Sequence, residues 1–168
     1  MRLAGRADRL GITHRRACAR TAAGFTLVEI LIVVVILGII AAIVLPEITA
    51  SREDTEAAVF VANLRRAFEA FRQYRQKHFS YPPNCNPGDV PAGMEPFLKG
   101  LKWDKPTSIG GRWDWDYVQF GYTAGVSVYK PDRGDAEMTD IDAMFDDGDL
   151  ITGAFRKRQD GYIYVIEY

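Results

Sequence analysis

The stretch GFTLVEILIVVVILGIIAAIVLP, residues 24–46, decides the fold of this chain. Between residues 25 and 45, only Thr26 and Glu29 have polar side chains. A helix rises about 1.5 Å per residue, so this segment would measure about 30 Å, the thickness of the hydrocarbon core of a bilayer. The apolar region of a secretory signal peptide is shorter, at about 7–15 residues. We therefore expect residues 25–45 to form a transmembrane helix.

The residues before this segment are basic. Residues 1–24 contain six arginines, at positions 2, 6, 9, 15, 16 and 20, and one acidic residue, Asp8. The positive-inside bias keeps this end of the segment in the cytoplasm and places the residues after 45 outside. Without residues 1–24, the formal net charge changes from −1 to −6. So acidic a chain is poorly suited to bind a phosphate backbone, and we expect no nucleic-acid partner.

Residues 46–79 continue the helical pattern in amphipathic form. Pro46 lacks an N–H and clashes with the preceding turn, so we expect the helix to kink or loosen there. Four prolines between residues 82 and 91 end the pattern. Apolar residues recur at intervals of three and four along one helix face: Ala57, Val61, Leu64, Phe68 and Phe71.

Residues 80–168 are predicted to form a β-rich globular head. In RWDWDYV, residues 112–118, aromatic and acidic side chains alternate as in a half-buried strand. A second strand is expected within residues 120–129, a short helix over 135–145, and a hairpin that turns at Asp160-Gly161. The expected fold class is α+β, with a long N-terminal helix packed on a small antiparallel sheet.

The order Gly24, Phe25, Glu29 and apolar run resembles the class III signal of type IV pilins and type II secretion pseudopilins. The resemblance implies cleavage between Gly24 and Phe25 by a prepilin peptidase, followed by N-methylation of Phe25. It also implies a pilin-like fold. The expected organisation is a cleaved leader (1–24), a transmembrane helix (25–45), its amphipathic continuation (46–79) and the head (80–168).

Glu29 becomes the fifth residue of the cleaved chain. A carboxylate inside a membrane span costs about 2.5–3.5 kcal/mol on insertion scales, so it needs a partner. The resemblance implies that this partner is the amine of Phe25 in a neighbouring subunit, and that Pro46 accompanies helix loosening in the assembled filament. The plainer alternatives are a signal anchor with a chance glutamate and, for Pro46, a simple kink.

The resemblance further implies a structural role, without enzymatic activity. The chain would be a pseudopilus subunit of type II secretion, held as a single-pass protein in the bacterial inner membrane with its head in the periplasm. Its expected partners are copies of itself, other pseudopilins, the prepilin peptidase and an inner-membrane assembly platform. The alternative is a type IV pilin for motility, adhesion or DNA uptake. A shortage of cysteines for a C-terminal staple favours the pseudopilin, since Cys18 precedes the cleavage point and only Cys85 follows it.

No cofactor is expected, with one open question about calcium. Some pseudopilins bind calcium in a C-terminal loop, and carboxylate oxygens suit that ion. This chain has an acidic cluster without EF-hand spacing, so a solvated surface is the alternative. Its members are Asp140, Asp142, Asp146, Asp147 and Asp149. Asp146, Asp147 and Asp149 share one predicted loop and are the candidate ligands.

Three weaker patterns have structural interpretations. Alternating Trp113, Trp115 and Tyr117 could stack on sugars, but such residues more often cover a core. His78 and Cys85 are the candidates for imidazole and thiol chemistry after residue 24, without a third partner in the sequence. The basic run 156–158 (Arg-Lys-Arg) is expected to be a solvated strand edge.

Overall fold

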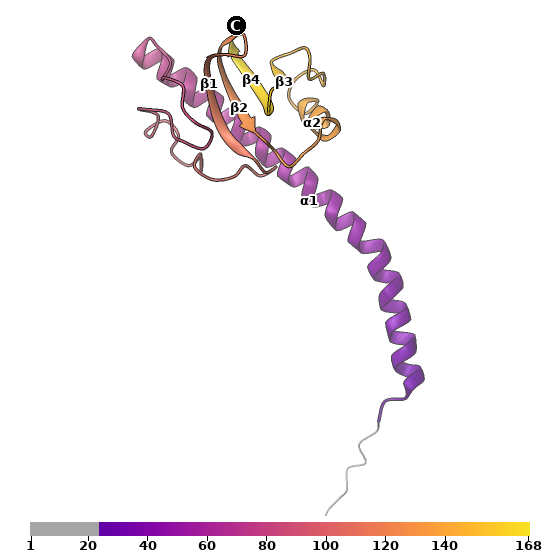
Figure 1. The fold of residues 1–168 in the computed structure, drawn as a ribbon. Coiled ribbons are helices and arrows are strands. Elements are labelled where there is room, and N and C mark those ends of the chain that lie inside the picture. The colour runs from indigo at the N-terminus through magenta and orange to yellow at the C-terminus, as the bar shows by residue number, and fades with distance from the viewer. Residues whose placement is uncertain (1–23) are drawn as a thin grey trace, which may run out of the picture. The chain divides into compact units, whose positions relative to one another are not determined.

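The computed structural model describes residues 24–168, apart from the side chains at positions 46, 49 and 50. The leader expected over residues 1–24, with its arginines and Cys18, lies outside the described residues except for Gly24. The elements follow in the order α1 (Leu27–His78), β1 (Arg112–Gln119), β2 (Tyr122–Tyr129), α2 (Asp135–Asp142), β3 (Phe155–Arg158) and β4 (Gly161–Glu167) (Figure 1). The chain divides into two units, residues 1–43 and 44–168.

The first unit contains most of a candidate membrane span. Leu27–Leu45 is long and apolar enough to cross a bilayer, and none of these 19 residues is buried within the chain. Exposed leucine, isoleucine and valine side chains on every face of a helix are compatible with a lipid or protein environment and unfavourable in water. Residue 46 falls within α1. Its side chain lies outside the description, so the kink expected at Pro46 stays a prediction.

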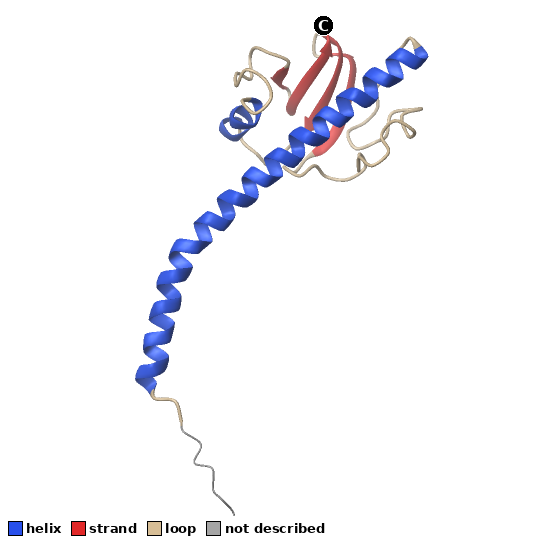
Figure 2. Cartoon of the chain, turned by 180° about the vertical axis from the view of Figure 1, so that it is seen from behind, coloured by secondary structure: helices blue, strands red, loops and turns tan. Residues whose placement is uncertain are grey.

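The second unit is the head, whose sheet lies against α1 (Figure 2). The four strands are antiparallel in the order β1-β2-β4-β3. Both strands expected from the alternating pattern are present, and with the long helix they confirm the predicted α+β, pilin-like fold class.

Aromatic side chains join the sheet to α1. Trp113 stacks on Phe60 with ring centroids 5.4 Å apart, and Trp115 stacks on Phe71 at 3.8 Å. Both tryptophans are at most 2% exposed, so the core interpretation is confirmed for them, and Tyr117 is partly buried against the same core. The Trp115 indole N–H donates to the Pro82 carbonyl at 3.0 Å, which satisfies the polar end of a buried ring.

Two predicted boundaries were wrong, one by three residues and the other by one. The helix predicted over 135–145 ends at Asp142, and the next residues form turns. The hairpin turn occupies residues 159–160 because Asp160 itself adopts a positive φ of 61°. Gly161 instead begins β4, where a Cβ would lie only 2.0 Å from the Val128 carbonyl oxygen. This glycine therefore permits close strand packing.

The expectation that the basic run 156–158 is solvated was wrong for Arg158. Its side chain is 4% exposed and lies on the sheet face opposite α1, with Asp114 and Asp116. Its Nη2 donates to Asp114 Oδ2 at 2.6 Å, and its Nε lies 3.3 Å from Asp116 Oδ2. The Ser127 hydroxyl also donates to Asp116. The two buried carboxylates require a cation, which explains the burial of the arginine.

This cluster holds more negative than positive charge. Burial, followed by the charge of Asp116, raises the pKa of Asp114 to about 6, although Arg158 opposes the shift. Burial also raises the pKa of Asp116, against the hydrogen bond from Ser127. The outer face of the sheet therefore carries a pH-sensitive ionic cluster, which we call the Arg158 cluster (Asp114, Asp116, Ser127 and Arg158).

Candidate functional site

The predicted cleavage junction is accessible. Residues 24–26 precede α1 and are not helical. Phe25 is 82% exposed, and among the described residues, chain neighbours aside, no atom lies within 4 Å of the position that a Cβ of Gly24 would occupy. A protease that binds its substrate in extended form can reach such a junction without unwinding a helix. Cleavage and methylation themselves stay predictions.

Glu29 closes a capping box with Thr26 at the start of α1. The Thr26 backbone N–H and hydroxyl both donate to Glu29 Oε2 at 2.8 Å, and the Glu29 N–H donates to the Thr26 hydroxyl at 3.2 Å. This reciprocal pairing satisfies donors that a helix N-terminus otherwise leaves free. Sequence reasoning missed it, although a threonine three residues before a glutamate at the head of an apolar run is its signature.

The capping box leaves part of the carboxylate available. Among the hydrogen bonds of the described residues, those to Glu29 involve Oε2 only, so Oε1 is free to meet a further donor. All of these contacts lie after the Gly24–Phe25 bond and would survive its cleavage. Glu29 is thus held at the helix N-terminus in an orientation that a cation could approach.

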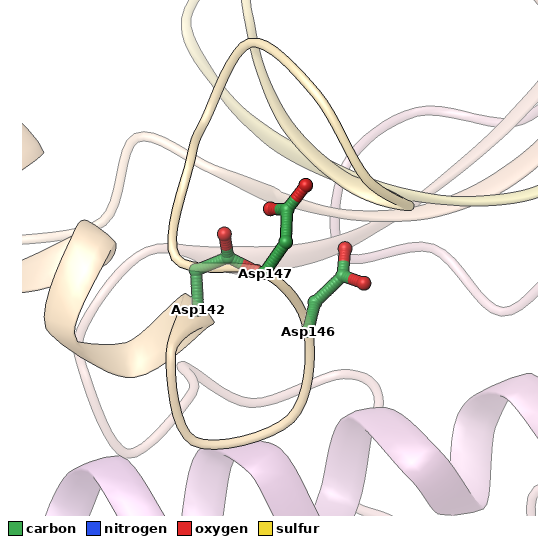
Figure 3. A group of neighbouring side chains, drawn as sticks. All are labelled: Asp142, Asp146 and Asp147. Atoms are coloured by element: carbon green, nitrogen blue, oxygen red, sulfur yellow. The ribbon is translucent and has the colours of Figure 1, made fainter.

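The acidic loop after α2 brings together three carboxylates. Asp142 comes from the last turn of α2, and Asp146 and Asp147 follow in the loop (Figure 3). Ligand oxygens from the three residues lie within 4.8 Å of one another. Asp149, one of the three predicted ligands, is not part of this group. Its Oδ1 instead accepts the Ile151 N–H at 2.9 Å and so shapes the loop.

Asp142 is the unusual member of the group. Its side chain is 0% exposed, and within the described residues neither carboxylate oxygen accepts a hydrogen bond of ordinary geometry. Burial, followed by the charges of Asp146 and Asp147, raises the pKa of Asp142 to about 6. The backbone N–H groups of Gly148 and Asp149 oppose this shift only in part. A buried carboxylate beside two others fits a hard cation, which would remove the cost of this arrangement.

The loop backbone supports the other two carboxylates. Asp146 Oδ2 accepts the Phe155 N–H at 2.9 Å, and Asp147 Oδ2 accepts the Thr152 hydroxyl at 2.7 Å. Gly153 has a positive φ of 65°, and a Cβ there would lie 2.3 Å from Asp146 Oδ2. The loop can therefore pass this close to the carboxylates only with glycine at position 153.

Cys85, the candidate thiol nucleophile, is poorly suited to nucleophilic catalysis. Burial, then the charges of Asp114, Asp89 and Asp116, raise the pKa of the Cys85 thiol to about 11, which disfavours the thiolate. His78 packs against the Tyr74 ring with centroids 4.3 Å apart.

Comparison with known proteins finds one family model that matches the N-terminal segment, and several relatives that match part of the chain. The family described as "Prokaryotic N-terminal methylation motif" matches residues 19–45. "Type II secretion system core protein G" of Pseudomonas aeruginosa is 34% identical over 88 residues, which cover 52% of this chain and 54% of that protein. "Type IV wide pilus major component PilA4" of Thermus thermophilus is 38% identical over 65 residues, 39% of this chain and 50% of that protein.

A third relative agrees with the first. "Type II secretion system core protein G" of Klebsiella pneumoniae is 36% identical over 59 residues, 35% of this chain and 42% of that protein. The chain thus spans about half the length of the relatives that it matches. No solved structure matches. The names of these relatives describe parts of a secretion system and a pilus, and none describes an enzyme.

Proposed function

We propose that this chain, which is pilin-like by its N-terminal methylation motif and by its fold class, is a structural subunit of a type II secretion pseudopilus. The carrying observation is that three features follow one another near the start of the described chain. An exposed Gly24–Phe25 bond, a capped Glu29 and an unburied apolar helix follow one another within residues 24–45. The likeness to core protein G of two organisms favours the secretion system.

The geometry supports a simple route to assembly. The apolar part of α1 would hold the chain in the inner membrane, with the leader in the cytoplasm and the head in the periplasm. The prepilin peptidase would then cleave after Gly24 and expose the amine of Phe25. Glu29 Oε1 would accept a hydrogen bond from this amine of a neighbouring subunit, and the pair would set the register between the packed helices. An inner-membrane assembly platform and other pseudopilins would be the further partners.

A type IV pilin is the second candidate. The similarity to the wide-pilus component of Thermus thermophilus favours it, because that match is as high in identity as those to core protein G. Both candidates share cleavage, membrane anchoring and the pairing at Glu29. A secretion assay and a piliation assay on a deletion strain would separate them.

The first prediction is cleavage between Gly24 and Phe25. Mass spectrometry of the protein from cells with an active prepilin peptidase should find Phe25 as the first residue, with a methyl group on its amine. A Gly24→Val variant should keep its leader, since a branched side chain would block a close-fitting protease. Phe25→Leu, which alters the residue after the bond, serves as the matched control and should still be cleaved. A wild-type protein that retains residues 1–24 would contradict the proposal.

We further propose that the acidic loop binds calcium through Asp142, Asp146 and Asp147. Calcium prefers six to eight oxygen ligands, and these carboxylates would supply the charged ones. The ion would neutralise the buried Asp142 and tie the end of α2 to the loop before β3. Its role would be to stabilise the head, because the ion would remove the repulsion among three neighbouring carboxylates.

The second prediction is that calcium stabilises the head through Asp142. At about 100 times its dissociation constant, calcium should raise the melting temperature by roughly 5–10 °C relative to EDTA. Asp142→Asn should remove this shift, because it deletes the charge at the buried position. Asp140→Asn changes a neighbouring exposed aspartate and should leave the shift intact. Equal melting temperatures of the wild type in calcium and in EDTA would exclude the site.

A further inference from the structure

We propose that two oppositely charged surfaces on opposite sides of α1 bind each other between neighbouring copies of this chain. One surface is an acidic groove between α1 and α2, and the other is a basic edge beside the loop before β1. This inference rests on the proposed filament function and adds to it a contact between heads, separate from the pairing at Glu29.

The acidic groove has a volume of about 400 Å³. Its floor is apolar, with Ala57, Ile109 and Ile141, and Met144 is 48% exposed at its side. Four acidic residues and one arginine complete the lining: Glu53, Asp54, Glu137, Asp140 and Arg133. The groove therefore offers both apolar contact and excess negative charge to an occupant.

The arginine of the groove is already engaged. Arg133 lies 2.7 Å from Glu56, 3.5 Å from Glu137 and 3.8 Å from Glu53, and its side chain is 15% exposed. Asp54 and Asp140 have no ion-pair partner within residues 24–168 as described. The free negative charge at the rim of the groove therefore sits on these two aspartates.

The basic edge carries the complementary charge. It consists of Arg66 on α1 and of Lys99 and Lys102 on the following loop, all three exposed. None of the three lies within ion-pair distance of a carboxylate in the described part of the chain. Arg66 and Lys99 also line a second hollow of about 440 Å³ with Phe97 and Leu98. Lysine side chains are long enough to reach into a groove while their stems cover apolar surface.

The two surfaces cannot meet within one molecule. Ala57 in the groove and Arg66 in the edge are nine residues apart on α1, which is about two and a half turns and about 14 Å along the axis. They therefore point to opposite sides of the helix. In both views, α2 and the loop before β1 lie on opposite sides of α1 (Figures 1 and 2). The surfaces can pair only between two copies.

This placement favours a filament over a closed pair. A contact between two different surfaces of the same chain is heterologous, so each bound copy leaves one groove and one edge free for the next. The axial offset between groove and edge would displace each copy along the helix direction. Charge pairing of this kind also steers association and disfavours the wrong register.

Charge reversal in the full-length chain tests the contact. The measured quantity is the filament yield, which is the amount of subunit in sedimented filaments divided by the amount in the membrane. Asp54→Lys with Asp140→Lys should lower the yield at least tenfold, and so should Lys99→Glu with Lys102→Glu. The fourfold variant should recover to within about threefold of the wild type. Glu95→Lys, an exposed change outside both surfaces, should have no effect. Unchanged yield in either reversal, or no recovery in the fourfold variant, would overturn the contact while leaving the filament proposal intact.

Disulfide trapping identifies the occupant. Asp140→Cys and Lys102→Cys, combined in a chain with Cys85→Ser, should produce a ladder of covalent multimers of this chain under oxidation. If the cysteine introduced by Asp140→Cys forms its disulfide with a different polypeptide, docking between copies is overturned and the groove belongs to a contact with another subunit. A wild-type chain that forms no filament at all would overturn the proposed function, and this inference with it.

Discussion

Glu29→Val is expected to abolish filament formation while leaving membrane insertion and cleavage intact. The valine removes a charge from the span, so insertion should be as easy or easier. The neighbouring amine of Phe25 loses a partner in an apolar environment, where an unpaired charge costs about 3 kcal/mol, or about 100-fold in association. Crosslinked dimers, scored beside a cleavage assay, measure the two effects separately.

The capping box makes the choice of variants informative. Glu29→Gln keeps an acceptor for Thr26, because glutamine also serves at this position of a capping box, but it removes the charge. Thr26→Val keeps the charge and removes the hydroxyl that contacts Glu29. If the charge acts in assembly, the Gln variant should fail like the Val variant, whereas Thr26→Val should still assemble. Normal filament yield from Glu29→Val would remove the mechanism.

Arg158→Ala should be the most destabilising change on the outer face of the sheet. It leaves Asp114 and Asp116 buried without their cation, and breaking such a buried pair typically costs about 3–5 kcal/mol. Lys157→Ala is the matched control, since Lys157 pairs with Asp135 at the surface and should contribute at most about 1 kcal/mol. Denaturant unfolding of residues 51–168, which keep every buried apolar residue of the core, measures both. A cost below 1 kcal/mol for Arg158→Ala would contradict the role of the cluster.

The Arg158 cluster also sets a pH dependence with a definite sign. The pKa of Asp114 is about 6 in the folded head, above the value of about 4 in an unfolded chain. The folded state therefore binds this proton more tightly, and the associated stability is present below pH 4 and lost as the pH rises through 6. Arg158 lowers this pKa, so Arg158→Ala should extend the loss to higher pH. An Asp142→Asn background removes the other carboxyl whose pKa is raised to about 6, which lies outside the Arg158 cluster.

The sequence predicted the N-terminal features because each of them is local. A membrane span is recognised by its length and composition, and the cleavage motif occupies six adjacent residues. The strand at residues 112–118 was predicted for the same reason, since its alternation needs only its own residues. The capping box of Thr26 and Glu29 is equally local and could have been predicted from their spacing.

The choice of candidate calcium ligands depended on where α2 ends, and sequence patterns locate helix ends poorly. With the helix extended to residue 145, Asp142 counted as a helical surface residue, and Asp149 was grouped with Asp146 and Asp147. In the structure α2 ends at Asp142, so the chain turns there and brings the buried carboxylate against the loop. Helix ends depend on capping and tertiary contacts as much as on periodicity.

By itself, the sequence determined that this chain has an apolar segment long enough to span a membrane, a glutamate near the start of that segment, an N-terminal methylation motif and a long helix leading to a β-rich head. Only the tertiary structure decided which charged residues are buried. Asp114 and Arg158 are 44 residues apart, and both look solvent-facing along their own strands. The register across the four strands places both side chains on the sheet face opposite α1, where Arg158 donates to Asp114. Such pairing depends on contacts between distant strands, which no local pattern encodes.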